Sequence, residues 1–256
     1  MKSKLIILGC GSSVGVPRID GVWGKCKKNN KKNIRTRCSA LIMKGKNIVL
    51  IDTSPDVKNQ LLSNKVKNIT SVIFTHEHAD QTNGLFELRP FFWRHRKRIN
   101  IYGNSKTINE LKHRQDYLFK KKIDYPAIVK PNIIKKKFSI GKNKEKILFR
   151  TFNAKHGRTN SVAYIFEKSA YISDTNDMSI VNLEILKNLK YLIIDCLKYD
   201  KHPSHFNLKE ALFIHQRLNP KKTILTNLHH DIDYDLLLNK LPKNVLPAYD
   251  GLSINL

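Results

Sequence analysis

Three potential metal ligands stand at alternate positions early in the chain. His76, His78 and Asp80 follow an apolar segment at residues 72–74, separated from it only by Thr75. In extended backbone, residues two apart project to the same side, so these side chains can converge on one small volume. Imidazole and carboxylate groups suit Zn²⁺, Mn²⁺ or Fe²⁺. One histidine alone would favour an ordinary polar loop, but three ligands at this spacing predict a metal site.

Residues 76–81 read His-Glu-His-Ala-Asp-Gln and resemble the signature of the metallo-β-lactamase superfamily, His-x-His-x-Asp-His after a strand. The other motifs of that family have matches in the same order, each beside an apolar segment. They are Asp52, His156, Asp174 and His229. The resemblance therefore covers most of the chain. It implies an α/β fold, a four-layer αβ/βα sandwich with the metal site at one edge between two sheets.

Three further segments point to one branch of that superfamily. Residues 9–17 read GCGSSVGVP, residues 37–39 read Arg-Cys-Ser, and residues 247–251 read PAYDG. They resemble the PhnP-like phosphoribosyl cyclic phosphodiesterases, which are similar to tRNase Z. This resemblance implies a metal-dependent hydrolase that cleaves a phosphodiester by attack of a metal-bound hydroxide. The expected substrate is small, such as a cyclic nucleotide or a phosphoribosyl compound.

The resemblance also implies a role for each matched residue. The first metal ion would bind His76, His78 and His156, the second would bind Asp80 and His229, and Asp174 would bridge the two. We therefore expect one or two divalent transition metal ions, Zn²⁺ or Mn²⁺, and we count Asp80 among the catalytic residues as well. Asp52 would orient the ligand loops without touching metal, and such residues fix ligand geometry.

Gln81 departs from the family pattern, which usually places a histidine for the second metal there. An amide oxygen is neutral and is a weaker donor to a transition metal than imidazole. Either the second ion binds loosely or a nearby group substitutes, with His230 and Asp231 as candidates. We expect Gln81 to lie beside the metal rather than on it. The departure also leaves a catalytically silent nucleic-acid-binding relative as an alternative.

His205 is the expected proton donor. It precedes a predicted helix over residues 207–218, and in the family a histidine just before this helix assists catalysis. A helix N-terminus disfavours the imidazolium, so we expect a bound phosphate to be needed for protonation. The alternative is an exposed loop histidine. Arg37 and Arg158 are expected phosphate clamps, because guanidinium pairs bidentately with phosphate.

The apolar segments predict the elements that carry these residues. Strands are expected at residues 4–8, 38–43, 48–51, 72–74, 148–152, 162–166, 171–173, 191–194 and 223–226. Helices are expected at residues 55–62, 105–119, 179–186, 207–218 and 234–239, the fourth with Asn207 as its N-cap. No repeat or Pro/Gly-rich hinge interrupts the chain, so one domain over residues 1–256 is the economical interpretation.

The chain of 256 residues has a net charge of +26, from 47 Lys and Arg against 21 Asp and Glu. Such a charge favours a polyanionic partner, and so a tRNase Z-like RNA endonuclease as the alternative function. The charge is not confined to one segment, however, and no inserted arm is evident that would grip a tRNA. Compositional drift is therefore the favoured interpretation. We expect a small phosphodiester substrate, while RNA binding and a homodimer stay open.

No segment reaches the roughly 20 apolar residues of a membrane span, and the first apolar run, at residues 5–8, is too short for a signal peptide. The four cysteines (Cys10, Cys26, Cys38 and Cys196) fit a reducing compartment. We therefore expect a cytoplasmic protein without membrane contact. Cys26 lies in the loop where relatives of this branch can carry a structural zinc, but no Cys-x-x-Cys pair stands there, so a buried thiol is favoured.

Overall fold

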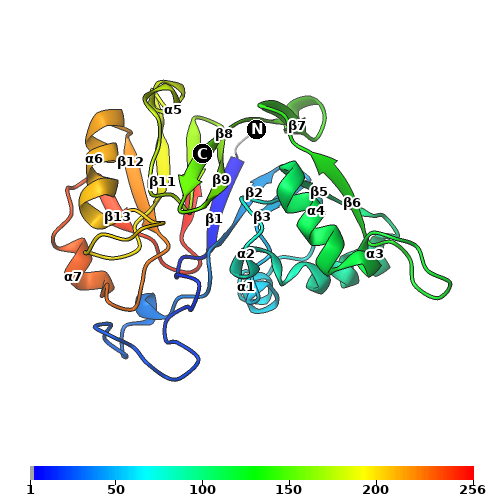
Figure 1. Ribbon diagram of the computed structural model, residues 1–256, viewed down its shortest axis with the longest axis horizontal. Helices are drawn as coiled ribbons and strands as arrows, with labels where there is room; N and C mark the ends of the chain where they lie inside the picture. The colour runs from blue at the N-terminus through cyan, green and yellow to red at the C-terminus, as the bar shows by residue number, and fades with distance from the viewer. Residues whose placement is uncertain (1–2) are drawn as a thin grey trace.

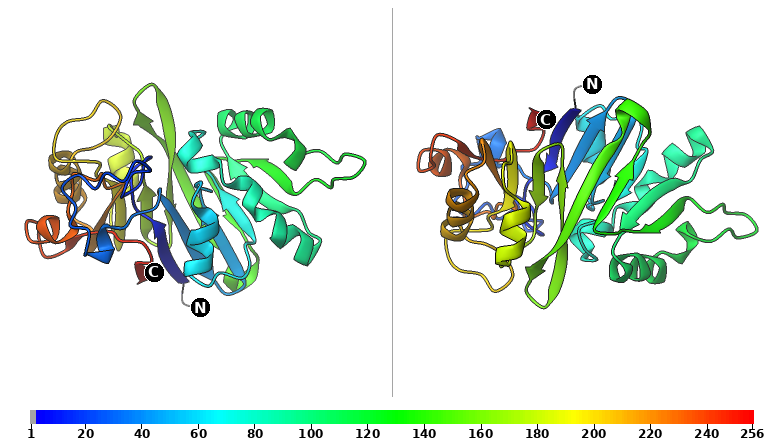
Figure 2. Two further views of the ribbon diagram at one scale, coloured as in Figure 1. Left: turned by 90° about the horizontal axis from the view of Figure 1, so that it is seen from below. Right: turned by 90° about the horizontal axis from the view of Figure 1, so that it is seen from above.

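Two seven-stranded sheets face each other and carry helices on their outer faces (Figure 1). The computed structural model describes residues 3–256, the side chains of residues 180 and 181 excepted. Figure 2 shows the same arrangement from two further sides, with α6 (Leu208–Leu218) and α7 (Tyr234–Leu238) at one end of the molecule and α3 (Arg89–His95) and α4 (Ser105–Arg114) at the other.

The first sheet has the strand order β14-β1-β2-β3-β4-β5-β6. Its strands are β1 (Ser3–Gly9), β2 (Ser39–Lys44), β3 (Asn47–Ile51), β4 (Ser71–Ile73), β5 (Ile99–Gly103), β6 (Val129–Ile133) and β14 (Ser253–Asn255). β14, β1, β2 and β3 pair antiparallel, whereas β3 to β6 pair parallel. The parallel part ends at the edge of the sheet where residues 75–81 begin.

The second sheet has the order β13-β12-β11-β10-β9-β8-β7. Its strands are β7 (Lys137–Ile140), β8 (Ile147–His156), β9 (Thr159–Phe166), β10 (Ser169–Ile172), β11 (Tyr191–Asp195), β12 (Lys222–Thr226) and β13 (Val245–Pro247). β7 to β10 pair antiparallel and β10 to β13 parallel. The carboxyl ends of the parallel strands lead into residues 173–175, 196–206 and 227–233.

Alternating side chains of each sheet serve two separate cores. Ile51 and Ile73 pack between the sheets with Phe149 and Tyr164, because successive residues of a strand point to opposite faces. Leu50 faces the other way and joins the core under the first set of helices. Both faces of the central strands are thus buried, which is why those strands read as continuous apolar runs. The four-layer αβ/βα sandwich predicted from the sequence is confirmed.

The remaining helices are short. They are α1 (Val57–Ser63), α2 (Ala79–Thr82) and α5 (Ile180–Ile185), with 3₁₀ turns at Lys31–Asn33, Leu85–Leu88, Asp116–Leu118 and Asn143–Glu145. The predicted cap of α6 is confirmed, since Asn207 and Glu210 form a reciprocal capping box. The helix predicted at residues 105–119 ends earlier, at Arg114, because Gln115 leaves helical geometry before the 3₁₀ turn. No helix in residues 3–256 is long and apolar enough to cross a membrane.

Candidate metal centre

The predicted ligands of the first motif lie just past β4. His76 is buried in the extended backbone after the strand, and His78 is the N-cap of α2. Asp80 lies inside α2, so the expectation of one extended run over residues 76–80 is wrong at its end. A single turn of helix brings the Asp80 carboxylate to the pocket that His78 also lines. His78 and Asp80 therefore line one pocket, as the alternate spacing predicted, but a turn of helix rather than extended backbone brings Asp80 there.

Three imidazoles from the two sheets meet at this edge. The His78 Nδ1 lies 2.9 Å from the His76 Nε2 and 3.3 Å from the His156 Nε2. Two nitrogens bound to one tetrahedral Zn²⁺, at about 2.0–2.1 Å each, lie about 3.3 Å apart. The three side chains also form one of the groups whose ligand atoms all lie within 4.8 Å of one another. This donor set fits a single divalent transition metal ion.

Hydrogen bonds on the outer side of two rings fix which nitrogen faces the centre. The His156 Nδ1 lies 2.7 Å from the Ser204 carbonyl oxygen, which can only accept, so Nδ1 carries the proton and Nε2 is free to bind metal. Gly157, with φ of +58°, allows this approach, since a Cβ there would lie 2.9 Å from the Ser204 side chain. The imidazole is thereby presented in the tautomer that a metal needs.

Asp52 acts on His76 through Thr75. The Thr75 hydroxyl donates to the Asp52 carboxylate at 2.8 Å, and its oxygen lies 3.0 Å from the His76 Nδ1. The Thr75 backbone N–H donates to the same carboxylate. Asp52 itself is fully buried at the end of β3 with φ of +60°, a strained geometry for a residue other than glycine. The structure therefore links Asp52 to His76 through Thr75, and the orienting role stays a prediction.

Burial keeps His76, which follows β4, neutral. Removal from solvent lowers the pKa of His76 to about 3, although the Asp174 carboxylate opposes the shift. Neutral imidazole is the form that binds metal, so His76 needs no deprotonation at neutral pH. Asp174 follows β10, is 2% exposed, and accepts from the Ser173 hydroxyl at 2.6 Å. Burial opposes its ionisation, but the imidazoles of His76 and His156 hold the pKa of Asp174 below its usual range.

The predicted ligands of a second metal ion are less closely gathered. Asp80, Asp174 and His229 line one pocket of about 380 Å³. Among the described residues, however, they do not form a group with all ligand atoms within 4.8 Å, as the three imidazoles do. Gln81 is 1% exposed, its Nε2 lies 3.3 Å from the Asp80 carboxylate, and its Oε1 has no hydrogen-bond partner. The predicted ligands of the second site therefore lie farther apart than those of the first.

We expect Gln81→His to strengthen binding of the second metal ion. An imidazole in the position of this amide adds a nitrogen donor next to Asp80, whereas the first site is unaltered. By analogy with other changes near metal ligands, the second dissociation constant should fall by about 10–100-fold. Calorimetric titration of apo-protein with Zn²⁺ measures both steps. Two equally tight sites in the natural sequence, unchanged in Gln81→His, would contradict this expectation.

His205 is paired with a carboxylate that the sequence analysis missed. Its Nδ1 lies 2.7 Å from the Oδ2 of Asp195, which is fully buried at the end of β11. Burial disfavours the imidazolium, but the Asp195 carboxylate outweighs it and raises the pKa of His205 to about 9. The expectation that a bound phosphate is needed for protonation is therefore wrong, because Asp195 supplies the negative charge. The missed signal was an apolar strand, YLIID, that ends in Asp.

His205 lies close to the three-imidazole cluster. Its ring centroid is 4.7 Å from that of His156, and its side chain lines the same pocket as Asp174. With Nδ1 turned to Asp195, the Nε2 is the ring nitrogen left to face that pocket. Asn227, with φ of +64°, donates to the Asp174 carboxylate at 3.3 Å and lies 3.1 Å from the His205 Nδ1. His205 thus lies beside Asp174, the predicted metal bridge.

Neither predicted arginine clamp lines the metal pocket. Arg37 pairs with Asp56 at 2.7 Å and donates to the Ser13 carbonyl, so it supports the pocket wall from behind. Arg158 is exposed and lines a separate polar hollow with Lys155. Among the described residues that line the metal pocket, Lys198 is the one lysine or arginine. Sequence position alone could not distinguish these cations, because the pocket wall is built from loops.

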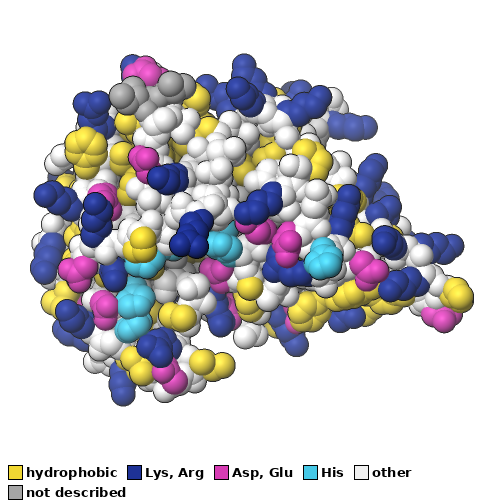
Figure 3. All heavy atoms as spheres, in the orientation of Figure 1, with side chains coloured by type: hydrophobic (Ala, Val, Ile, Leu, Met, Phe, Trp, Pro, Cys, Tyr) yellow, Lys and Arg dark blue, Asp and Glu magenta, His cyan; other side chains and the backbone are white. Residues whose placement is uncertain are grey.

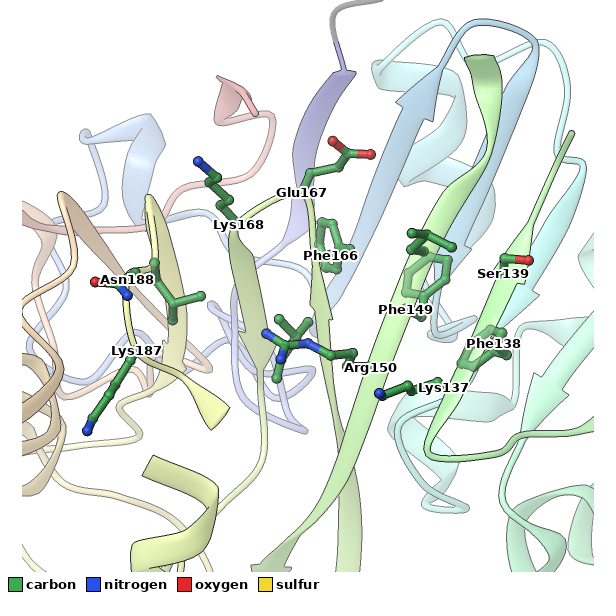
Figure 4. A pocket seen from close by; sticks show the side chains of 13 residues that line it. Lys137, Phe138, Ser139, Phe149, Arg150, Phe166, Glu167, Lys168, Lys187 and Asn188 are labelled. Atoms are coloured by element: carbon green, nitrogen blue, oxygen red, sulfur yellow. The ribbon is translucent and has the colours of Figure 1, made fainter. Parts of the chain in front are cut away.

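A larger cavity lies away from the metal residues. It has a volume of about 630 Å³, and its lining side chains come from β7, β8, the end of β9 with the turn after it, and residues 187–189 (Figure 4). Arg150 in this cavity and His156 at the metal centre are six residues apart on β8, or about 20 Å along the strand. Size therefore does not identify the site, whereas the clustering of ionisable groups does.

The four cysteines are buried as free thiols. The Cys26 Sγ donates to the Ile232 carbonyl at 3.2 Å, and the groups of described residues that could hold a metal include no cysteine. The weak signal for a structural zinc at Cys26 is not supported, and a buried thiol accounts for it. His229, His230 and Asp231 do form such a group, in which the His229 Nδ1 lies 3.0 Å from the Asp231 carboxylate.

Positive charge is spread over the face that carries the histidines. Figure 3 shows Lys and Arg side chains on all parts of this face, with His side chains near its middle. This matches the sequence, in which the charge of +26 is not confined to one segment. A nucleic-acid footprint needs clustered positive charge as well as a high net charge, so the spread charge does not by itself indicate one.

Comparison with known proteins gives two sequence matches. The beta-lactamase superfamily domain matches residues 47–229. A curated relative named octanoyltransferase, from Porphyromonas gingivalis (strain ATCC BAA-308 / W83), is 32% identical over 253 residues, which are 97% of this chain and 51% of that protein. The chain therefore spans about half the length of that curated relative.

Solved structures with the same architecture include a new diphosphatase from the PhnP family, with a TM-score of 0.91, 30% identity, and coverage of 100% of this chain and 98% of that one. The metallo-β-lactamase fold protein YhfI from Bacillus subtilis has a TM-score of 0.74 at 17% identity, with 100% of both chains covered. The short form of human tRNase Z has a TM-score of 0.70 at 17% identity, with 98% of both chains covered. The last two show the fold alone.

Proposed function

The chain belongs to the beta-lactamase superfamily, and from this premise we propose that it is a metal-dependent phosphodiesterase. The observation that carries the proposal is the His205–Asp195 pair beside the three-imidazole cluster. A metal donor set beside a charged imidazole supports this proposal, because cleavage of a phosphate ester can use a metal-activated water and a proton for the leaving group. The 30% identity to a PhnP-family diphosphatase supports phosphate chemistry.

The imidazoles and Asp174 have separate proposed roles. His76, His78 and His156 would hold a metal ion, which would activate a water and neutralise charge on the phosphate when bound. His76 and His156 are held in the correct tautomer by Thr75 and Ser204, so their geometry is set before any ion arrives. Asp174 would be the carboxylate shared by two ions, since it is buried and its lowered pKa keeps it ionised at neutral pH. Zn²⁺ and Mn²⁺ both accept these donors.

His205 is proposed to protonate the departing alkoxide. Because Asp195 raises its pKa to about 9, His205 carries the proton at neutral pH. Donation from Nε2 leaves a neutral imidazole whose Nδ1–H still donates to Asp195. The pair therefore holds the ring in place before and after transfer. General acid catalysis of this kind contributes typically about 10²–10⁴-fold.

Lys198, rather than Arg37 or Arg158, is proposed as the cation that contacts the substrate phosphate. It is half-buried, directly after Leu197 in the wall of the pocket. The pocket volume of about 380 Å³ is near the lower end of small-molecule sites. A small phosphodiester of the cyclic nucleotide or phosphoribosyl class fits such a pocket better than a folded RNA does.

A substrate panel tests the proposal. Metal-loaded protein is assayed with bis-p-nitrophenyl phosphate, a cyclic ribose phosphodiester and a nucleoside diphosphate. We expect turnover of the two diesters. Cleavage of the diphosphate alone would replace the phosphodiester by a phosphoanhydride as the substrate, in line with the diphosphatase relative. Turnover of none of the three would contradict the proposal.

An RNA endonuclease is the second candidate, favoured by the charge of +26 and the basic face in Figure 3. Affinity that rises with RNA length and falls steeply with salt would support it, because each neutralised phosphate releases counterions. Cleavage of a precursor RNA with no turnover of small diesters would establish it in place of the small-substrate activity. RNA binding without any cleavage, on a protein that binds no metal, would instead indicate the silent relative.

Acyl transfer, which the name of the P. gingivalis relative describes, is not part of the proposal. Exchange of a thioester through cysteine needs an accessible thiolate. Burial raises the pKa of every cysteine here, Cys10, Cys26, Cys38 and Cys196, above its ordinary value. These thiols are therefore poor nucleophiles.

We expect Asp195→Asn to shift the alkaline limb of the pH profile to lower pH. A general acid must carry its proton, so with Asp195 present the rate should fall only as pH rises through about 9. Without the carboxylate, burial lowers the pKa of His205, and the limb should move toward the ordinary histidine value of about 6.5. The measurement is kcat/KM against pH for a diester with an alkoxide leaving group. An unmoved limb, in a variant that stays folded across the pH range, would show that His205 is not the acid.

A further inference from the structure

Arg35 carries a buried positive charge without a carboxylate beside it. The side chain is 1% exposed and heads the largest fully buried side chains of the protein. No Asp or Glu oxygen of the described residues lies within 4.0 Å of its guanidinium, unlike that of Arg37. Burial of an unpaired cation is costly, and an apolar side chain of the same volume would fill the space without that cost. A purely space-filling role therefore does not explain an arginine here.

The guanidinium instead joins two loops behind the metal pocket. Its Nη1 donates to the His229 carbonyl at 3.2 Å, and its Nη2 donates to the Asn33 Oδ1 at 3.1 Å. The Cys26 Sγ lies 3.8 Å from Nη1, whereas the buried Nε has no hydrogen-bond partner among the described residues. Because the two Nη atoms form a rigid planar fork, both acceptors are held at fixed positions relative to each other.

Further hydrogen bonds hold each of the two loops that Arg35 joins. The Arg35 backbone pairs with Val16 through two hydrogen bonds of 2.8 Å, next to the Ser12–Val14 wall of the metal pocket. Asn33 donates to the Asp233 carboxylate at 2.7 Å, and Asp233 caps α7. The His229 backbone N–H donates in turn to the Leu197 carbonyl. The His229 backbone is thus held on both sides, by Leu197 at its N–H and by Arg35 at its carbonyl.

We propose that Arg35 is a positioning residue that sets the place of His229, and through it the affinity of the second metal ion. The proposal rests on the metal site of the proposed function but not on which ester is cleaved. The second site has Gln81 where the family usually has a histidine, and its predicted ligands do not gather as the three imidazoles do. With one donor missing, the fixed geometry of the remaining ones decides how well the ion is held.

Metal titration of Arg35 variants tests the proposal. Apo-protein is titrated calorimetrically with Mn²⁺ and with Zn²⁺, comparing wild type, Arg35→Met, Arg35→Lys and the exposed control Arg217→Met. We expect Arg35→Met to weaken the second step by about 10–100-fold and to leave the first step unchanged. Arg35→Lys keeps the charge but cannot reach both acceptors as a fork, so it should fall between Arg35→Met and wild type. Arg217→Met should match wild type in both steps.

The affinities of the first and second metal-binding steps together distinguish a positioning role of Arg35 from a general loss of stability. If Arg35→Met fails to fold, Arg35→Lys carries the comparison. Equal losses in both steps, or a second step like that of wild type in a folded Arg35 variant, would overturn the proposal. So would a wild-type protein with no second step at all. Turnover of phosphodiesters by wild type is measured separately. A protein without that activity whose second step still responds to Arg35 would disprove the proposed function and leave the positioning role intact.

Discussion

Asp174→Asn should abolish nearly all turnover while leaving the protein folded. A shared carboxylate supplies negative charge to both metal positions, and the amide that replaces it is neutral. Metal ions contribute several kcal/mol to transition-state stabilisation, and a loss of about 4 kcal/mol corresponds to a roughly 10³-fold slower reaction. We therefore expect kcat for bis-p-nitrophenyl phosphate to fall by at least about 10³-fold. The measurement is steady-state turnover at saturating metal.

The shape of the asparagine makes this substitution informative. Its Oδ1 can still accept from Asn227, and its Nδ2 can donate to the Ser173 hydroxyl, so the buried contacts of Asp174 have replacements. A thermal melt of the apo-protein is the control and should change little. Near-full activity in a folded Asp174→Asn would show that the carboxylate after β10 is not part of the metal centre.

His205→Ala should slow the cleavage of poor leaving groups far more than that of a nitrophenyl ester. A departing alkoxide is strongly basic and needs a proton, whereas nitrophenolate leaves without one. We expect a loss of about 10²–10⁴-fold for an alkyl diester and a small loss for bis-p-nitrophenyl phosphate. The ratio of the two losses is the quantity of interest, since a binding defect would affect both substrates.

His202 offers a matched control on the same loop. It lies beside His205, with ring centroids 5.2 Å apart, and lines the same pocket, but its Nδ1 contacts Ser204 rather than a carboxylate. His202→Ala should therefore not reproduce the dependence on the leaving group. Equal losses on both substrates in His205→Ala would point to a structural role for His205, most simply through its contact with Asp195.

The sequence predicted most of the central strands but not the edges of the sheets. β6, β7, β13 and β14 are the four edge strands, and none was predicted. Edge strands are often short and carry Lys or Pro, which hides them from an apolar pattern. β6, for example, contains Lys130 and Pro131. β5 and α3 were missed as well. The parallel strands β4, β10 and β12, by contrast, read as apolar runs that lead into predicted ligands.

The parts of the site that escaped prediction depend on tertiary contacts. Asp195 ends an apolar strand just as Asp174 follows one, but only the fold shows that it faces His205. Arg35 lies in a polar loop where an exposed arginine is the ordinary expectation, and its burial arises from loop packing against residues 229–235. The arginines predicted as phosphate clamps lie outside the pocket lining for the same reason, whereas Lys198 lines it.

Metal content coupled to turnover tests the central claim most directly. The purified protein is analysed for transition metals, stripped with a chelator, and assayed with bis-p-nitrophenyl phosphate before and after reconstitution with Zn²⁺ or Mn²⁺. We expect at least one tightly bound ion per chain at the His76, His78 and His156 cluster. Turnover should be lost on stripping and recovered on reconstitution, with a further rise when excess Mn²⁺ fills the second site. A protein that binds neither ion after reconstitution, or whose turnover is the same with and without metal, would contradict the account.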